Sequence, residues 1–223
     1  MKKTIEIKVP QSWEGVTLRQ YLALKADMET YKDEPEAIIA CLFHHLCNFP
    51  PQYLAQMDID TYISIKRDIT QFLNNTKYPL KRFITIDGVE YGFEPNLSQM
   101  AYGAYVDISK YETLEINDKW GEIMSILYRP VTKKSGALYD IKTYSGELYS
   151  DKFLDVTMDA HWGAVFFFKD LLRDLQNSIL KSLKVEYPAM DLHPKLKQIL
   201  QESGEAIHPS SNWPVEILQK LMK

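Results

Sequence analysis

The fold of this chain is decided around the stretch Phe83-Ile84-Thr85-Ile86-Asp87-Gly88-Val89-Glu90-Tyr91-Gly92-Phe93. β-branched and aromatic residues stand on both sides of Asp87-Gly88, as is typical of two paired strands. Aspartate followed by glycine tolerates the positive φ angles that a two-residue hairpin turn requires. The stretch therefore predicts a β-hairpin over residues 83–93.

Helical patterns precede this hairpin. Thr17, Asp33 and Asp60 are each suited to cap a helix, because each is followed by apolar residues that recur every three or four positions. The clearest of these helices ends before Pro50-Pro51. Its predicted buried face consists of Ile38, Ile39, Leu42, Phe43 and Leu46. The helix after Asp60 is expected to bury Ile63, Ile65, Ile69, Phe72 and Leu73.

Helical patterns also follow the hairpin. Asn96 or Ser98 can cap a short helix, and Asn117 can cap another, which Pro130 is expected to end. The apolar positions of these two helices are Met100, Ala101, Ala104 and Tyr105, and then Trp120, Ile123, Met124, Leu127 and Tyr128. The longest predicted helix runs from about Thr157 to Lys184 and has a wide apolar face, typical of a helix at the centre of a core.

The rest of the sequence predicts two more short strands and an extended arm. Thr4 to Val9 alternates as a short edge strand does, and residues 138–143 resemble a strand after a polar turn at 133–136. Past Val185, four prolines cut the chain into short pieces: Pro188, Pro194, Pro209 and Pro214. We therefore predict a mostly α fold with a small β component, a body over residues 1–184, and an extended C-terminal arm over residues 185–223.

Composition narrows the classes of function. Hydrophobic residues make up 45% of the 223 residues and charged residues 25%, which suits a globular protein with a substantial core. The net charge of −4 gives no basic patch for a polyanion, so we expect no sequence-specific nucleic-acid partner. No apolar run approaches the roughly 20 residues of a membrane span, and the N-terminal residues lack the apolar region of a secretion signal. No membrane partner is expected.

Two groups of residues carry side chains that could bind a metal or transfer protons. Cys41, His44, His45 and Cys47 carry zinc-binding side chains, but residue 47 turns away from the helical face that residues 41 and 45 share. Asp159 and His161 stand two positions apart on a helix and so point to different sides, which favours a helix-start role for Asp159. We expect no metal site, no cofactor and no catalytic residue. The predicted class is a non-enzymatic protein.

Aromatic residues suggest protein contacts instead. The chain has 14 tyrosines and four tryptophans, and aromatic side chains are enriched in the anchors of protein interfaces. Most are expected in the core, including Trp13. Within the proline-rich arm, Trp213, Tyr187 and Leu218 are the predicted partner-binding residues, with packing on the same subunit as the equal alternative.

Three segments, taken in order, resemble structural and assembly proteins of tailed bacteriophages. They are Val9-Pro10-Gln11-Ser12-Trp13 with Val16-Thr17-Leu18-Arg19-Gln20-Tyr21, then Gly103-Ala104-Tyr105-Val106-Asp107-Ile108, then Ile126-Leu127-Tyr128-Arg129-Pro130. With the hairpin between the first two and the long helix after the third, the likeness covers most of residues 4–184. The chain looks most like the tail ring proteins of crAss-like phages. The same segments also resemble the tail assembly chaperones of siphophages.

The ring-protein resemblance implies a virion component near the portal vertex, made in the cytoplasm of the bacterial host. Its partners would be copies of itself in a ring, the portal protein, and other tail ring or tail proteins. The chaperone resemblance implies a protein that binds the tape measure protein and is absent from the mature virion. An enzyme with scattered catalytic residues is the third hypothesis; a ligand pocket with a strongly perturbed acid or base would favour it.

Overall fold

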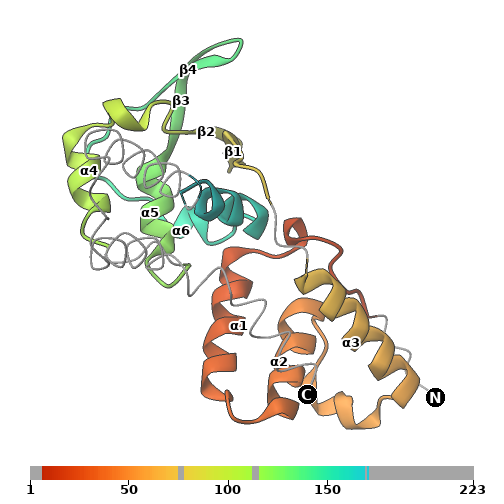
Figure 1. Ribbon diagram of the computed structural model, residues 1–223. Helices are drawn as coiled ribbons and strands as arrows, with labels where there is room; N and C mark the ends of the chain where they lie inside the picture. Colours follow the sequence, from red (N-terminus) through yellow and green to blue (C-terminus); the bar gives the residue numbers. More distant parts are fainter. Residues whose placement is uncertain (1–6, 75–77, 112–115, 169, 171–223) are drawn as a thin grey trace, which may run out of the picture.

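The computed structural model describes residues 7–74, 78–111, 116–168 and 170, and the elements below lie within them. Figure 1 shows a lobe of helices that leads into a second lobe with the sheet. The helical lobe contains η1 (Trp13–Gly15), α1 (Leu18–Thr30), α2 (Pro35–Cys47), η2 (Pro51–Gln56) and α3 (Ile59–Leu73). The predicted mostly α fold with a small β component is confirmed.

The second lobe combines a small sheet with short helices. Its elements are β1 (Phe83–Ile86), β2 (Val89–Phe93), η3 (Leu97–Gln99), α4 (Tyr102–Ile108), α5 (Trp120–Leu127), β3 (Tyr128–Ser135), β4 (Leu138–Ile141) and α6 (Ser150–Phe153). A helical segment at residues 158–168 follows. It begins next to Thr157, as predicted, but the expected continuation to Lys184 and the arm at 185–223 lie outside the described residues.

Caps define the starts of the first helices. The Thr17 hydroxyl accepts a bond from the Gln20 amide, and the Gln20 side chain accepts one from the Thr17 amide at 2.9 Å, which is a capping box. For α2 the N-cap is Glu34 instead of the predicted Asp33, because Pro35 occupies the first helical position. The α3 cap is Asp58 instead of Asp60, because the Asp58 carboxylate accepts from the Thr61 amide at 2.8 Å.

The predicted hairpin is confirmed with its turn. β1 and β2 pair antiparallel, with Ile86 opposite Val89, and Asp87 and Gly88 have φ angles of 51° and 76°. Positive φ at both central residues is the geometry that suits the twist of a two-residue hairpin. The sheet order is β1-β2-β3-β4, all antiparallel neighbours.

Several local predictions were wrong. Helix α5 ends at Leu127, and Tyr128 starts β3 without an intervening loop, so Pro130 lies inside a strand. Pro130 fits because its carbonyl accepts from the Lys142 amide at 2.8 Å, a bond that needs no N–H from proline. Residues 133–135, predicted as a turn, extend β3, which leaves only positions 136–137 between β3 and β4.

Other corrections concern three smaller features. Residues 7–9 form no strand, and the rest of the strand predicted from Thr4 lies outside the described residues. Ile63 is exposed, because it stands two positions before buried Ile65 and therefore on another face of α3. Helix α4 has Ala101 at its N-cap and starts at Tyr102, later than predicted, because η3 takes up residues 97–99.

The two lobes share one core. Trp13, fully buried as predicted, packs against Phe72 of α3 at 4.6 Å between ring centroids and against Trp162 of the segment 158–168 at 5.8 Å. Backbone bonds reinforce this joint, since the Leu18 amide donates to the Val156 carbonyl at 3.0 Å. The first amides of α1 are thereby satisfied by the other lobe. The joint therefore fixes the helical lobe relative to the sheet.

Candidate partner-binding surface

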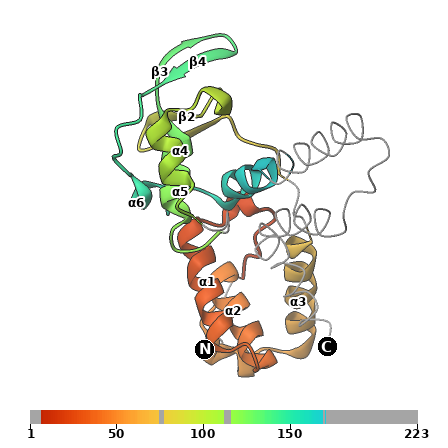
Figure 2. The same ribbon diagram turned by 60° about the vertical axis from the view of Figure 1, so that its left-hand side comes forward.

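The β3–β4 hairpin projects from the second lobe at the end of the molecule farthest from the helical lobe (Figures 1 and 2). Residues 132–138 are all exposed, and the side chain of Leu138 beside its turn is 79% exposed. An apolar side chain that reaches so far into solvent gains nothing from the fold of its own chain. The hairpin is therefore a candidate contact element.

A buried ion pair holds the base of this hairpin. The Arg129 guanidinium donates to the Glu94 carboxylate at 2.5 Å, to the Ile126 carbonyl at 2.6 Å and to the Lys142 carbonyl at 2.8 Å. Both partners of the ion pair are over nine-tenths buried. Because three carbonyl or carboxylate groups surround one guanidinium, the charge is compensated and the start of β3 is tied to the end of β4.

A close approach at Gly92 folds the hairpin over the rest of the sheet. A Cβ atom at Gly92 would lie 2.8 Å from Cε2 of Tyr139, so only glycine leaves room for this ring. The Tyr139 hydroxyl donates to the Phe93 carbonyl at 2.7 Å, and its ring packs against Phe83 at 4.6 Å between centroids. Lys134 lies 3.8 Å from the centroid of the Phe83 ring. β4 thus becomes the wall of a groove instead of a flat sheet edge.

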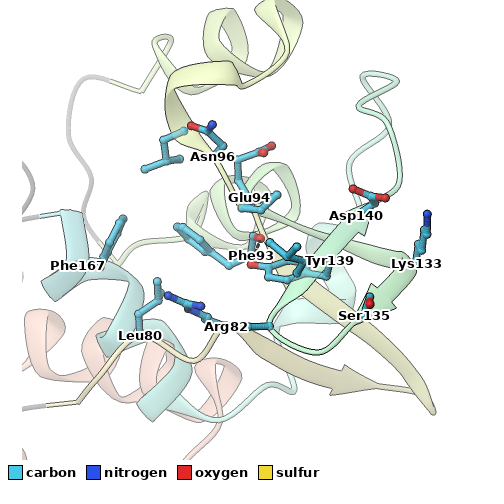
Figure 3. Close-up of a pocket in the computed structure, with 14 residues that line it drawn as sticks. Leu80, Arg82, Phe93, Glu94, Asn96, Lys133, Ser135, Tyr139, Asp140 and Phe167 are labelled. Carbon is cyan, nitrogen blue, oxygen red and sulfur yellow. Dashed lines mark hydrogen bonds between the residues drawn. The ribbon is translucent and has the colours of Figure 1, made fainter.

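The groove lies between this wall and the segment 158–168 and has a volume of about 770 Å³ (Figure 3). Its apolar lining includes Leu80, Phe93, Leu97, Leu138 and Phe167. Its charged lining includes Arg82, Lys133 and Asp140, besides Glu94, which the ion pair with Arg129 occupies. An open apolar floor with charged walls suits a protein segment better than a small polar metabolite.

The opposite end of the molecule is acidic and also carries exposed apolar side chains. The end of α1, η2 and the start of α3 lie together at this end in both views (Figures 1 and 2). Tyr31, Tyr53, Ile59 and Ile63 are exposed there, Ile59 at 66% and Ile63 at 54%. We call this surface, residues 29–36 and 53–63, the acidic end.

Helix α4 offers further exposed aromatic surface. Tyr102 is 80% exposed and Tyr105 is also exposed, while Ala104 between them is fully buried. The Tyr144 hydroxyl donates to the Asp107 carboxylate and joins α4 to the segment after β4. Partial burial, and then this bond, raise the pKa of Tyr144 to about 12, so it remains a neutral donor. The helix is thus held in place with two tyrosines facing solvent.

The cysteine and histidine group lies in α2 but does not converge. His45 bonds the Asp27 carboxylate of α1 at 2.7 Å, whereas His44 is exposed. Cys41 and Cys47 are free, buried thiols, and burial raises the pKa of Cys47 to about 11. Among the residues that the structure describes, no group of three or more metal-ligating side chains comes together. The interpretation of buried cysteines and a partner-bonded histidine therefore describes this group.

Asp159 and His161 occupy separate environments. Asp159 lies in the first turn of the segment 158–168, where it accepts from the Thr157 hydroxyl at 2.6 Å and pairs with Lys81. This agrees with the helix-start role. His161 accepts at Nδ1 from the Trp120 indole at 3.0 Å and donates from Nε2 to the Val156 carbonyl at 3.3 Å. Complete burial lowers the pKa of His161 to about 4, so the ring is neutral.

The predicted partner-binding residues and the groove come from different parts of the chain. Trp213, Tyr187 and Leu218 lie outside the described residues. The groove is not predictable from local sequence patterns, because its walls come from β2, β4 and the segment 158–168. Gly92 inside a strand was the available signal, since an interior glycine often marks a close approach.

The chain was compared with protein-family models, with curated proteins and with solved structures, and none of the three comparisons gives a match. In the part of the chain described above, no helix combines the length and the apolar character that a bilayer crossing demands.

Proposed function

We propose that this chain is a structural subunit of a tailed-phage virion that forms an oligomeric ring in the tail or head-to-tail connector below the portal. Its role is non-enzymatic and its contacts are made through protein packing. The partners are copies of itself, the portal protein and other tail ring or tail proteins. It is made in the bacterial cytoplasm and resides at the portal vertex of the virion.

The observation that carries this proposal is where the large exposed apolar side chains lie. Most of those in the described residues occur on the β3–β4 hairpin, on α4 and at the acidic end, which belong to both lobes; the others are Val89 and Leu148. Leu138, Tyr102 and Ile59 are each exposed by more than 60%. Exposed apolar groups on several faces are expected of a subunit that meets several neighbours, because each contact hides part of them from water.

The polar interior also supports a structural role. Arg129 with Glu94, and His161 with Trp120, are buried pairs whose hydrogen bonds go to other groups of the chain. A catalytic pair needs an open side toward a substrate. The Arg129–Glu94 pair is over nine-tenths buried, although Glu94 forms part of the groove lining, and His161 and Trp120 are fully buried. Their contribution is to fix the shape of the second lobe, from which the hairpin projects.

The phage resemblance is compatible with this body. Its first segment, around Trp13 and Tyr21, forms the joint between the lobes, and its third, Ile126 to Pro130, leads from α5 into β3. These two segments therefore set the position of the helical lobe relative to the β3–β4 hairpin. Because the resemblance to the phage proteins falls on residues inside the fold, it supports a common fold more than a common binding surface.

Assembly of the purified chain tests the proposal. Analytical ultracentrifugation should give a closed oligomer with one defined mass, and stable subunit contacts of this type bury upwards of about 2,000 Å². A chain truncated after Val185 should fold but fail to assemble, because the arm is expected to dock on a neighbour. A monomer at every concentration, or full assembly of the truncated chain, would refute the corresponding part of the proposal.

A tail assembly chaperone that binds the tape measure protein is the second candidate. The observation in its favour is the open groove, whose apolar floor suits an extended or helical segment of another protein. Mass spectrometry of purified virions separates the two candidates. A stoichiometric amount in the particle supports the ring subunit, and absence from the particle together with a complex with the tape measure protein in infected cells supports the chaperone.

A further inference from the structure

The inference in this section rests on the proposed ring function and concerns how one copy meets the next. The β3–β4 hairpin, whose residues line the groove, and the acidic end of the helical lobe lie at opposite ends of the molecule in both views (Figures 1 and 2). They differ in charge and share exposed apolar side chains. Two different patches on opposite ends are what a head-to-tail contact requires.

The groove presents two cations that form no ion pair with the described residues. Arg82 and Lys133 both line it and both are exposed, and neither makes an ion pair with any residue in the described ranges. Figure 3 shows Arg82 beside Leu80 on one side of the groove and Lys133 on the other. Asp140 is the one exposed carboxylate in the described lining, so the free charges sum to about +1.

The acidic end carries the complementary charge. Residues 29–36 contain four carboxylates, Glu29, Asp33, Glu34 and Glu36, and one lysine. The start of α3 adds Asp58 and Asp60. The acidic end therefore contains six carboxylates and one lysine, and its net charge is −5. Ile59 and Ile63 stand four positions apart on one face of α3 and supply an apolar ridge among these charges.

Charge decides which ends can meet. Two acidic ends repel each other, which disfavours a symmetric contact between them. The acidic end and the groove attract each other, and apolar side chains are available on both sides of such a contact. Repeated contacts between unlike patches close into a ring, or grow as a filament if the rotation does not close.

We infer that the subunits associate head to tail, with the groove of one copy, between Arg82 and Lys133, receiving the acidic end of a second copy, around Asp33, Glu34 and Ile59. Tyr31 and the isoleucines of α3 then pack on the apolar floor of the groove. The carboxylates of the acidic end pair with Arg82 and Lys133 at its rim.

Charge reversal in the full-length chain tests this contact. The variant Arg82→Glu/Lys133→Glu should associate at least about tenfold more weakly than the wild type, measured by sedimentation over a concentration series. The matched control is Lys119→Glu/Lys152→Glu, which makes the same change in net charge at two exposed lysines outside the groove. The control should assemble as the wild type does. Circular dichroism and thermal midpoints check that both variants fold.

The reciprocal variant, Asp33→Lys/Glu34→Lys/Glu36→Lys, changes the charge of the acidic end from −5 to +1 and should also lose assembly. The decisive result is rescue. The chain that combines all five substitutions has a negative groove and a positive opposite end, and it should assemble again. An equimolar mixture of the two charge-reversed variants should likewise assemble, although each alone does not. In the mixture the negative groove of the Arg82→Glu/Lys133→Glu chain meets the positive end of the reciprocal variant, and the unaltered groove of the reciprocal variant meets the unaltered acidic end of the other chain. Only a contact between these two patches predicts both rescues.

The outcomes separate this inference from the function on which it rests. If the wild-type chain never assembles, the ring function fails and the inference fails with it. If the wild type assembles and the groove variant assembles equally well, the ring function stands and the head-to-tail contact is wrong. If both charge-reversed variants lose assembly but neither rescue works, the two patches do not meet. Loss of assembly only on truncation after Val185 would assign the contact to the arm.

Discussion

Acidification should destabilise this protein through one buried histidine. His161 is completely buried in the segment 158–168, with Nδ1 accepting from the Trp120 indole and Nε2–H donating to the Val156 carbonyl. Both ring nitrogens are thus committed in the neutral form. A proton on Nδ1 would face the indole N–H and would also place a charge in an apolar surrounding. The folded chain therefore resists protonation that the unfolded chain accepts.

The size of the effect follows from the pKa of His161. Burial is the main cause that lowers this pKa from 6.5 to about 4 in the folded state. Because the folded pKa is the lower one, the unfolded chain binds the proton first. The free energy of unfolding is therefore complete above about pH 6.5 and decreases as the pH falls toward 4. At 1.36 kcal/mol for each pH unit, the total loss is about 3 kcal/mol.

Urea unfolding of the wild type and of His161→Gln, measured between pH 7.5 and 4, isolates this contribution. Glutamine can accept from Trp120 and donate to Val156 but does not titrate, so the variant should lack this part of the pH dependence. His44→Gln, at an exposed position of α2, is the control and should follow the wild type. Equal pH slopes for the wild type and His161→Gln would refute the argument.

Three further perturbations test the structure around the groove and in the helical lobe. Arg129→Met leaves the Glu94 carboxylate buried without its partner and should lower the free energy of unfolding by about 3–5 kcal/mol in urea titrations; a loss below 1 kcal/mol would contradict the buried pair. Gly92→Ala forces a Cβ against Tyr139 and should cost about 1–3 kcal/mol by the same assay, whereas Gly15→Ala, whose Cβ meets its nearest atom at 3.5 Å, should cost less. Cys47, with its pKa raised to about 11, should react with a thiol reagent at pH 8 only after unfolding, and rapid native labelling would argue against its burial.

Local signals predicted the parts of the fold that depend on neighbouring residues. The turn at Asp87-Gly88 and the cap at Thr17 each involve residues within a few positions, and both are confirmed. The predicted end of α5 was wrong because it depends on a distant residue. The helical spacing continues through Tyr128, but pairing with Phe93 of β2 converts this residue into a strand, and that partner lies 35 positions away.

The groove depends even more than the end of α5 on contacts between residues that are far apart in the sequence. Tyr139 reaches Gly92 and Phe83 only because β3 bends and carries β4 over the sheet, with a shift in register between Val131 and Lys133. The spacing of residues along the sequence does not predict such a bend.

The central claim is that this polypeptide acts by joining copies of itself through different patches at its two ends. The most direct test is electron microscopy of the purified full-length chain. The account predicts rings in which the β3–β4 hairpin of each subunit meets the α1–α3 lobe of the next. Isolated monomers at high concentration, or dimers joined by the same patch on both subunits, would contradict it.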